Sequence, residues 1–268
     1  MSVLTHRRFV LATGAAVAAV GAEAFIRQPR RVTVTRHRIG KGQRPLRVVQ
    51  LTDLHLHGIH AFESRVAAMT TQLEPDIIVF TGDSIDHRNG IGLLDEFLGL
   101  LVQDTPKYAV LGNWDYWSGA SIAEIRQVYE RHECRLLINE TVVHDADGRH
   151  IRLTGVDDLV AGRPDVATEP VTGNEIPHIL LAHCPGYREH AERVVGGSFS
   201  YMLSGHTHGG QITFFGFAPV LPRGSGGYVS GWYREAGRLP LYVARGVGTT
   251  MIRARLGAPP ELALFEIG

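Results

Sequence analysis

The chain has 268 residues, and its 27 Lys and Arg balance 27 Asp and Glu, so the formal net charge is zero. With 44% hydrophobic and 20% charged residues it has the composition of a globular protein, which excludes disordered, collagen-like and polytopic membrane classes. The neutral balance also removes any broad electrostatic case for nucleic acid as a partner, and the length predicts one α/β domain.

Residues 1–26 have the order of charge and apolarity that is typical of an export signal. Arg7 and Arg8 precede an apolar run rich in Ala, Val and Gly, and Ala22 and Ala24 end it in an AxA-like pattern. The paired arginines followed by Phe-Val-Leu resemble a twin-arginine signal, which directs export of folded proteins. We therefore expect export by this route to the periplasm or cell envelope. An uncleaved segment would instead anchor the chain in the inner membrane.

The rest of the chain predicts alternating strands and helices. Residues 27–45 form a basic linker with a candidate edge strand at 32–39, and residues 46–268 form the main domain. We expect strands at 46–51, 76–80, 107–111, 178–182, 200–204, 239–246 and 261–267, and helices at 61–73, 91–103 and 120–131. The Gly- and Pro-rich stretch 216–240 predicts a long loop over a site.

Five predicted strands end in side chains of the types that bind metal ions. These residues are Asp53, His55, Asp83, Asn113, His183, His206 and His208. Ligands of α/β sheets bind outside the carboxyl ends of the strands, so we expect these side chains to converge on one rim. Asp, Asn and His together suit a hard or borderline divalent cation, and seven such groups are about what two cations need.

Each of these residues taken alone has a commoner structural explanation. Asp or Asn after a strand is usually a turn former or a helix N-cap, and a lone histidine such as His183 is commonly a core residue. The ordered set DxH, GDxxD, GNxD, HxP and GHTHGG is very improbable by chance. The metal hypothesis therefore depends on the whole set of motifs.

These motifs resemble a known family. The segments are TDLH at 52–55, GDSID at 82–86, GNWD at 112–115, AHCP at 182–185 and GHTHGGQ at 205–211, and they resemble the five motifs of the calcineurin-like metallophosphoesterases. Further similarity lies in APVLP at 218–222, YVSG at 228–231 and ARGVGTT at 244–250. It points to the bacterial branch that includes twin-arginine-exported members and UDP-2,3-diacylglucosamine hydrolases. The resemblance implies an α/β fold with two mixed β-sheets in a sandwich flanked by helices.

The resemblance also implies a role for each motif residue. The implied ligands of the first metal are Asp53, His55 and His208, those of the second are Asn113, His183 and His206, and Asp83 bridges the two. The implied cofactors are two divalent ions, which are Mn, Fe or Zn in this family. The implied catalytic residues are Asp83, Asn113 and Asp115, while Asp86 supports the site without binding metal.

Trp114 departs from the family pattern. The family usually has GNHD or GNHE, whose His contacts the phosphate and helps to protonate the leaving group; here Trp114 replaces it and its usual partner Asp115 remains. Indole cannot donate that proton, and positioned acid catalysis contributes about 10²–10⁴-fold in rate. The loss matters least for phosphoanhydrides, whose leaving groups are already weak bases. Some lipid A pathway hydrolases of the superfamily also lack this His.

The implied reaction is hydrolysis in which a hydroxide shared by two cations attacks phosphorus in line. The leading hypothesis is a phosphohydrolase of a phosphoanhydride or phosphoester, with a UDP-linked diacyl sugar of the lipid A pathway as one substrate. One alternative is a general exported phosphodiesterase or phosphatase of the cell envelope. The other is a metal-binding module that lost turnover with the histidine at position 114.

The expected partners are a phosphate-containing small molecule or a lipid-linked substrate, and a membrane surface. The aromatic residues that suit an acyl-chain wall, a membrane-facing rim or plain core packing are Phe214, Phe215, Phe217, Trp232 and Tyr233. Arg188 and Arg245 are candidate phosphate contacts, although exposed solubilising arginines are the favoured interpretation. No oligomeric state is indicated.

Overall fold

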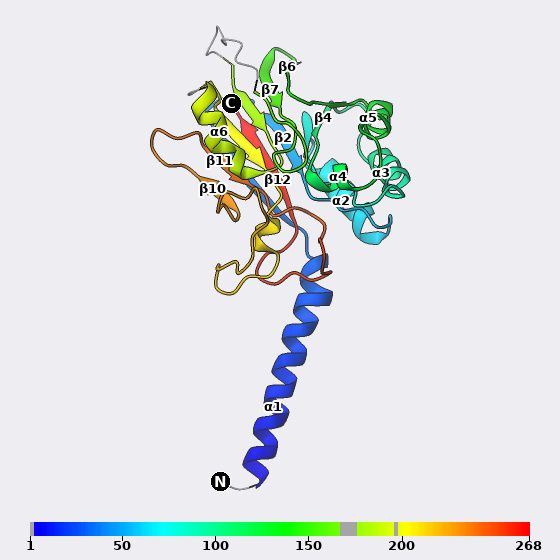
Figure 1. The fold of residues 1–268 in the computed structure, drawn as a ribbon, viewed down its shortest axis with the longest axis vertical. Helices are drawn as coiled ribbons and strands as arrows, with labels where there is room; N and C mark the ends of the chain where they lie inside the picture. The colour runs from blue at the N-terminus through cyan, green and yellow to red at the C-terminus, as the bar shows by residue number, and fades with distance from the viewer. Residues whose placement is uncertain (1–2, 167–175, 196–197) are drawn as a thin grey trace.

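Two six-stranded β-sheets pack face to face in the computed structural model, which describes residues 3–166, 176–195 and 198–268 (Figure 1). The first sheet contains β1 (Thr33–Ile39), β2 (Leu46–Leu51), β3 (Ile77–Thr81), β4 (Lys107–Val110), β5 (Cys134–Leu136) and β12 (Glu261–Ile267). The second contains β6 (Glu140–Ala146), β7 (Arg149–Gly155), β8 (His178–Leu181), β9 (Tyr201–Ser204), β10 (Gly231–Tyr233) and β11 (Leu241–Val243).

The strand order makes both sheets mixed. It is β1-β12-β2-β3-β4-β5 in the first sheet and β10-β11-β9-β8-β7-β6 in the second. The first sheet pairs β12 with β2 antiparallel and β2 with β3 parallel, while the second pairs β6 with β7 antiparallel and β7 with β8 parallel. The predicted sandwich of two mixed sheets is therefore confirmed.

The central strands are largely apolar because both of their faces are covered. In β2, Val48 packs between the two sheets, whereas the next residue, Val49, and then Leu51 face the helices. The layer between the sheets is completed from the second sheet by side chains such as Leu153 and Leu181. This double burial explains why these strands are short runs rich in Val, Ile and Leu in the sequence.

Helices cover the outer faces of the sandwich (Figure 1). The helices α2 (Ala61–Gln72), α3 (Gly90–Gly99) and α5 (Ile122–Arg131) contribute to the core on the first sheet, and α6 (Arg188–Val195) to the core on the second. Helix α5 shows how the sequence sets an end: Ser121 caps it by accepting from the Glu124 N–H at 3.2 Å, and the Glu124 carboxylate binds the Ser121 N–H at 2.8 Å.

The N-terminal helix α1 (Val3–Ala22) projects away from the sandwich (Figure 1). A π-helical turn (Glu23–Arg27) and a 3₁₀ turn (Gln28–Arg30) connect it to β1, which lies at the edge of the first sheet. Among the described residues, none of the helices combines the length and the apolar character needed to cross a bilayer.

Four strands, β5, β6, β7 and β10, were not predicted from the sequence. Strands β6 and β7 form a hairpin whose turn is Asp147-Gly148, with φ angles of 54° and 78°. An Asp-Gly pair with two positive φ angles is the usual signal of a two-residue hairpin turn. The hairpin lies at a sheet edge, where alternate residues face solvent, so its strands lack the continuous apolar runs on which the prediction depended.

Candidate metal centre

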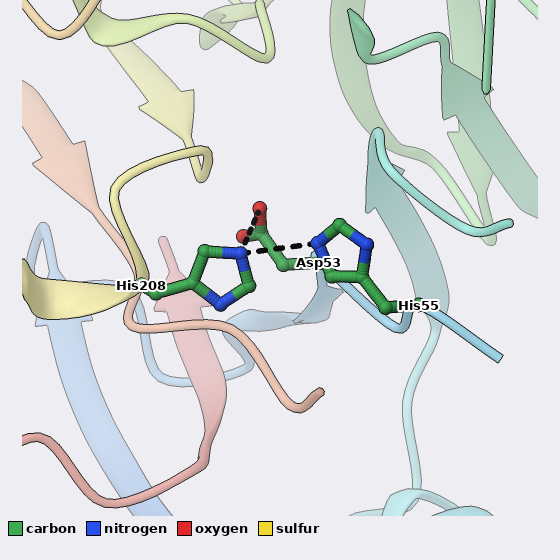
Figure 2. A group of neighbouring side chains, drawn as sticks. All are labelled: Asp53, His55 and His208. Carbon is green, nitrogen blue, oxygen red and sulfur yellow. Dashed lines mark hydrogen bonds and ion pairs between the residues drawn. The ribbon is translucent and has the colours of Figure 1, made fainter. Parts of the chain in front are cut away.

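Loops from both sheets bring the predicted ligands together at the carboxyl ends of the strands. The structure forms two groups: a first group of Asp53, His55 and His208 (Figure 2), and a second group of Asp83, His183 and His206. Within each group the candidate ligand atoms all lie within 4.8 Å of one another, and all six residues are buried. Residues that are up to 155 positions apart in the sequence (53 to 208) therefore form one compact site.

The first group directs two imidazoles and a carboxylate at one point (Figure 2). The Nε2 atoms of His55 and His208 are 3.0 Å apart, and Asp53 Oδ1 lies 3.5 Å from His208 Nε2. A neutral imidazole has one nitrogen with a free lone pair, so two facing nitrogens beside a carboxylate form a donor set that suits a divalent cation.

The second group has the same character and adjoins the first. His183 Nε2 lies 3.1 Å from both Asp83 Oδ2 and His206 Nδ1. Asp83 Oδ2 is also 3.8 Å from His55 Nε2, so this carboxylate lies between the two groups. The Asp83 position therefore suits a ligand that two cations share.

Asn113 begins the one-turn helix α4 (Asn113–Trp117), directly after β4 and its loop. Its Oδ1 atom is buried and has no hydrogen-bond partner among the described residues. A buried acceptor without a partner costs about 1–3 kcal/mol, and native proteins rarely leave one unsatisfied. A cation would satisfy this neutral oxygen, so the residues fit bound metal.

Neighbouring groups hold the outer nitrogen of each imidazole. Two are backbone carbonyls: Thr81 O lies 2.8 Å from His183 Nδ1, and Arg223 O lies 2.8 Å from His206 Nε2. The other two are side chains: the Asp86 carboxylate contacts His55 Nδ1, and the Arg255 guanidinium lies 3.3 Å from His208 Nδ1. The carboxylate and the two carbonyls can accept the outer N–H, which fixes the ring orientation and leaves the inner nitrogen free to bind a metal. The Arg255 guanidinium has no acceptor atom, so it restricts only the position of the His208 ring.

Five of the seven predicted ligands have left-handed backbone conformations. The φ angles are 52° for Asp53, 44° for His55, 54° for Asp83, 73° for His206 and 51° for His208. Such a conformation costs a non-glycine residue about 1–3 kcal/mol and is retained only where the surroundings fix it, which happens most often at functional sites. The loops are therefore strained at the residues whose side chains converge.

Two glycines that directly precede ligands leave room for the carboxylates. A Cβ atom on Gly112 would lie 2.2 Å from Asp83 Oδ1, and a Cβ atom on Gly205 would lie 2.5 Å from Asp53 Oδ2. Both distances are far shorter than a van der Waals contact, so any larger residue would displace the carboxylate. This close approach gives the Gly-Asn and Gly-His pairs of the motifs a steric explanation.

The charges of the site partly balance one another. Burial raises the pKa of Asp83, but the neighbouring His183 outweighs it and the pKa falls to about 2. Burial lowers the pKa of His183, but the charge of Asp83 raises it to about 10. Burial lowers the pKa of His206 to about 4. Bound cations would provide the positive charge that His183 otherwise supplies to the buried carboxylates.

Asp115 lies outside both groups. Its buried carboxylate accepts hydrogen bonds from the backbone N–H groups of Gly112, Asp83 and Ser84 at 2.9 Å each, and of Ile85 at 3.1 Å. Burial, followed by the charge of Asp83, raises the pKa of Asp115 to about 7. Asp115 ties the loop after β3 to the start of α4, and so acts on the site by positioning Asp83.

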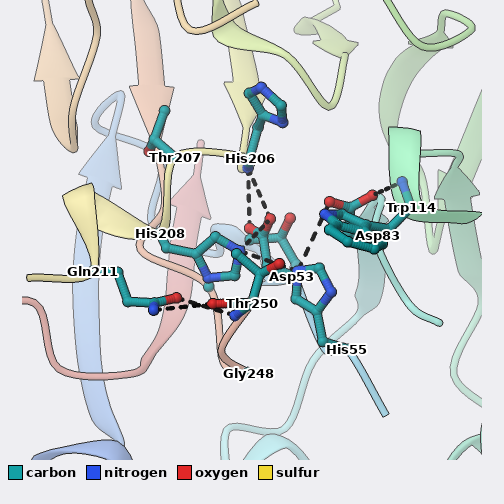
Figure 3. Close-up of polar contacts among 12 residues, drawn as sticks. Asp53, His55, Asp83, Trp114, His206, Thr207, His208, Gln211, Gly248 and Thr250 are labelled. Carbon is teal, nitrogen blue, oxygen red and sulfur yellow. Dashed lines mark hydrogen bonds and ion pairs between the residues drawn. The ribbon is translucent and has the colours of Figure 1, made fainter. Parts of the chain in front are cut away.

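Trp114 lies beside Asp83 and next to His55 of the first group (Figure 3). Its indole packs edge-on against His55 with a centroid distance of 6.2 Å, and against Trp117 at 5.6 Å. Its backbone N–H donates to Asp83 Oδ1 at 2.8 Å. The half-buried ring therefore places an apolar edge, and no acid, beside the site.

The two arginines singled out in the sequence have structural roles. Arg188 is completely buried and donates to the Leu239 carbonyl at 2.7 Å and to the Glu235 carboxylate at 2.6 Å. Arg245 is half-buried and donates to the Pro259 carbonyl at 3.0 Å. The favoured interpretation as exposed solubilising residues is therefore wrong, because both guanidinium groups are engaged within the fold.

Sequence reasoning missed Arg255, which is completely buried beside the first group. Its guanidinium donates to the carbonyls of Ala258 at 2.8 Å and Gly246 at 3.1 Å, next to the His208 ring. Burial lowers the pKa of Arg255 to about 9. A single Arg beyond the last matched motif gave no spacing signal, although it fastens the 244–250 segment beneath the site.

The stretch 216–240, predicted as a long loop, passes beside the second group. Arg223 accepts a hydrogen bond from His206 at 2.8 Å, and Val229 accepts one from the Thr207 hydroxyl at 2.6 Å. The stretch also contains the three-residue strand β10, which was not predicted.

Comparison with known proteins identifies relatives along most of the chain. A model of the calcineurin-like phosphoesterase family matches residues 46–210, a range that contains all seven candidate ligands. The Bacillus subtilis metallophosphoesterase YkuE is 30% identical over 287 residues, which cover 100% of this chain and 99% of YkuE. The Escherichia coli phosphodiesterase YaeI is 28% identical over 278 residues, covering 98% of this chain and 99% of YaeI.

Proposed function

The chain belongs to the calcineurin-like phosphoesterase family, and on this premise we propose that it is a two-metal phosphodiesterase that favours weakly basic leaving groups. Its membership makes it a metal-dependent hydrolase of phosphoester bonds. The observation that carries the finer proposal is the pair of adjacent ligand groups with Asp83 between them, next to a tryptophan in place of an acid. The name of the relative YaeI, a phosphodiesterase, supports the preference for diesters.

In this proposal one cation is held by the first group and the other by the second group together with Asn113. Two divalent cations, when bound, act as Lewis acids that stabilise charge on phosphate oxygens and activate water. Asp83 is shared, and Asn113 contributes an uncharged oxygen, so the site carries less negative charge than a further carboxylate would give. That balance favours an anionic phosphate substrate.

Trp114 sets the leaving-group preference. Its indole lies beside His55, and the indole N–H can donate a hydrogen bond but is too weak an acid to protonate a departing oxygen. Asp115 does not take over this role because its carboxylate accepts four backbone N–H groups. The reaction therefore depends on leaving groups that depart without protonation, such as nucleotide monophosphates or phenolates.

A leaving-group series tests this proposal. The full-length protein, loaded with Mn²⁺, is given phosphodiesters with p-nitrophenyl, phenyl and methyl leaving groups. We expect kcat/KM to fall steeply from aryl to methyl, and Trp114→His to raise the methyl rate by about 10–100-fold while changing the p-nitrophenyl rate little. Equal rates for aryl and methyl esters in the unsubstituted protein would contradict the proposal. Metal binding without any turnover in both proteins would favour a metal-binding module.

A lipid-linked phosphoanhydride, such as a UDP-linked diacyl sugar, is the second candidate substrate. It is favoured by the exposed phenylalanines of the loop that follows the GHTHGG motif, because acyl chains need an apolar contact surface. A side-by-side assay with this lipid and a soluble aryl diester separates the candidates. Turnover of the lipid alone supports the anhydride, and turnover of the diester alone supports the general phosphodiesterase.

We further propose that residues 1–26 direct export by the twin-arginine route, to the periplasm or cell envelope or to an anchored position in the inner membrane. The pair Arg7-Arg8 before an apolar run carries this proposal. Fusing residues 1–45 to a reporter that is active only when exported folded tests it. Arg7→Lys with Arg8→Lys should abolish export, and unchanged export would contradict the route.

A further inference from the structure

Three chain segments meet at the end of the molecule from which α1 projects (Figure 1). The segments are residues 23–31, 211–223 and 250–258, which we call the tip. The backbone N–H of Arg255 donates to the Ala24 carbonyl at 2.9 Å, and that of Thr213 donates to the Leu256 carbonyl at 2.7 Å. These bonds hold the segments side by side, although they lie far apart in the sequence.

The tip exposes a set of large apolar side chains. They are Phe25, Ile26, Phe214, Phe215, Phe217, Val220, Met251 and Ile252, all between 53% and 111% exposed. Single exposed apolar residues are normal on soluble proteins, but a cluster of eight on three adjoining segments is not. A gathering of this kind marks an interaction surface.

Phe215 occupies a turn position that is unfavourable for an aromatic residue. Phe214 and Phe217 exchange backbone hydrogen bonds at 3.0 and 2.9 Å, so Phe215 and Gly216 form the two-residue turn between them. Their φ angles are 50° and 83°, which is the region that favours Gly, Asn and Asp. The strained turn holds a completely exposed phenylalanine at its apex, where it packs against nothing within the fold.

The charges of the tip are almost all positive. Its exposed arginines are Arg27, Arg30, Arg31, Arg223 and Arg253. The single acidic residue in the three segments is Glu23, which is 3.5 Å from Arg27. Exposed aromatic side chains surrounded by arginines match the headgroup region of a bilayer that contains anionic lipids, where rings enter the interface and arginines meet phosphates.

The apolar surface continues along α1. Leu11, Val17 and Val20 of this helix are also exposed, and the helix leaves the molecule at the tip itself (Figure 1). Because the C-terminal end of α1 adjoins the tip, the helix extends the same apolar surface away from the molecule. A protein partner would have to cover both, whereas a lipid interface accommodates both without specific complementarity.

We propose that the tip is a membrane-binding surface that places its phenylalanines and Met251 in the headgroup region of an anionic bilayer. This inference goes beyond the proposed phosphodiesterase and does not depend on it. It also has a consequence for the site, because the tip is built on ligand-bearing segments. Residues 211–223 begin three positions after His208. Gln211 binds the Thr250 carbonyl, and the segment of Thr250 reaches Gly248, whose N–H donates to the Asp53 carbonyl (Figure 3).

Fluorescent probes at single positions of the full-length chain test the proposal. The dye NBD is attached to Phe215→Cys, to Met251→Cys and, as the matched control, to Val143→Cys, which is 57% exposed on the edge strand β6. The native cysteines, Cys134 and Cys184, are buried and free, so they are protected from labelling. Each protein is mixed with vesicles of phosphatidylcholine and phosphatidylglycerol, with and without nitroxide-labelled lipid.

We expect the emission at positions 215 and 251 to increase, shift to the blue and be quenched by nitroxide lipid, and the emission at position 143 to stay unchanged. Replacing Phe214, Phe215 and Phe217 together by Ser should weaken vesicle binding by about ten-fold or more. These side chains are exposed, so the substitution leaves the packed core intact.

Three results would overturn the proposal. Vesicle binding with unquenched probes at 215 and 251 would mean that α1 alone contacts the lipid. Equal quenching at 143 and 215 would mean that the chain binds without orientation. A change at 215 that depends on protein concentration and needs no vesicles would mean that the tip joins two copies of this chain. None of these results bears on hydrolysis of soluble diesters.

Discussion

The two ligand groups of the site share Asp83 but are held in place differently. In the first group, side chains orient the imidazoles: Asp86 contacts His55, and Arg255 lies beside His208. In the second group, backbone carbonyls do so, from the loop residue Arg223 and from the strand residue Thr81. The orientation of the imidazoles in the first group can therefore be changed by substituting side chains outside the group. In the second group it can be changed only through the backbone or through the candidate ligands themselves.

The largest expected effect comes from removing the Asp83 carboxylate, which lies between the two groups. Asp83→Ala should abolish binding at both groups and lower kcat/KM by at least about 10³-fold, because the carboxylate lies within 3.8 Å of imidazoles of both groups. Metal content per chain and hydrolysis of bis(p-nitrophenyl) phosphate measure this. His87→Ala, an exposed neighbour of the motif, is the control and should change neither. Full activity of the Asp83→Ala protein would contradict the hypothesis that Asp83 is a ligand shared by both cations.

A selective loss is expected from Arg255→Met. The first group should bind Mn²⁺ about 10–100-fold more weakly while the second keeps its affinity, because Arg255 fastens the segment beneath His208. Calorimetric titration with Mn²⁺ resolves the two affinities. Arg245→Met is the matched control, since Arg245 binds the Pro259 carbonyl of the same region. Arg245→Met should lower the melting temperature about as much as Arg255→Met does, without changing the Mn²⁺ affinity of either group. An equal loss of Mn²⁺ affinity at both groups in Arg255→Met would contradict the selective role of Arg255.

A smaller effect is expected from Asp86→Asn. The carboxylate of Asp86 makes the His55 ring a stronger base and fixes its orientation, so the amide should weaken the first group by about ten-fold. The same titration measures it. His57→Gln removes the other partner of Asp86, at 3.2 Å, and serves as the control that leaves the His55 contact in place. Unchanged affinity in Asp86→Asn would show that the backbone alone orients His55.

The smallest effect concerns a histidine on the strand that leads to His183 but outside both groups. Burial lowers the pKa of His178 to about 4, from about 6.5 in the unfolded chain. As pH falls below 6.5 the unfolded chain binds this proton first, so stability is complete above 6.5 and is lost toward 4. Urea denaturation should show that the free energy of unfolding falls by up to about 2 kcal/mol between pH 6.5 and pH 5. The fall should be smaller in His178→Gln, which lacks this imidazole. Equal losses would contradict this role.

The sequence predicted that these side chains would converge because each one follows a strand, and strand ends in α/β sheets meet at one edge. Their role as metal ligands stays a prediction. Asp53 and His183 are 130 positions apart, yet both stand directly after buried apolar runs that were identified as strands. Chain position after a strand is a local property that a sequence pattern contains. The left-handed φ angles of the ligand loops could not be predicted in this way, because they arise from contacts made on folding.

The residues that the sequence missed act through the backbone. Arg255 binds carbonyl groups, which every residue has, so its partners leave no pattern in the sequence. Asp115 was named from the sequence as a catalytic residue, which stays a prediction, but its bonds to four backbone N–H groups around Asp83 were not predicted. The β6–β7 hairpin was missed because it is an edge element with alternating polarity, although its Asp147-Gly148 turn was visible.

One experiment tests the central claim, that two adjoining groups hold two cations and that both are needed for hydrolysis. Metal-depleted full-length protein is titrated with Mn²⁺ while bound metal and hydrolysis of bis(p-nitrophenyl) phosphate are followed in the same sample. We expect two ions to bind per chain, with activity that rises as the second ion binds. Full activity with one ion per chain, or in the metal-depleted protein, would contradict it.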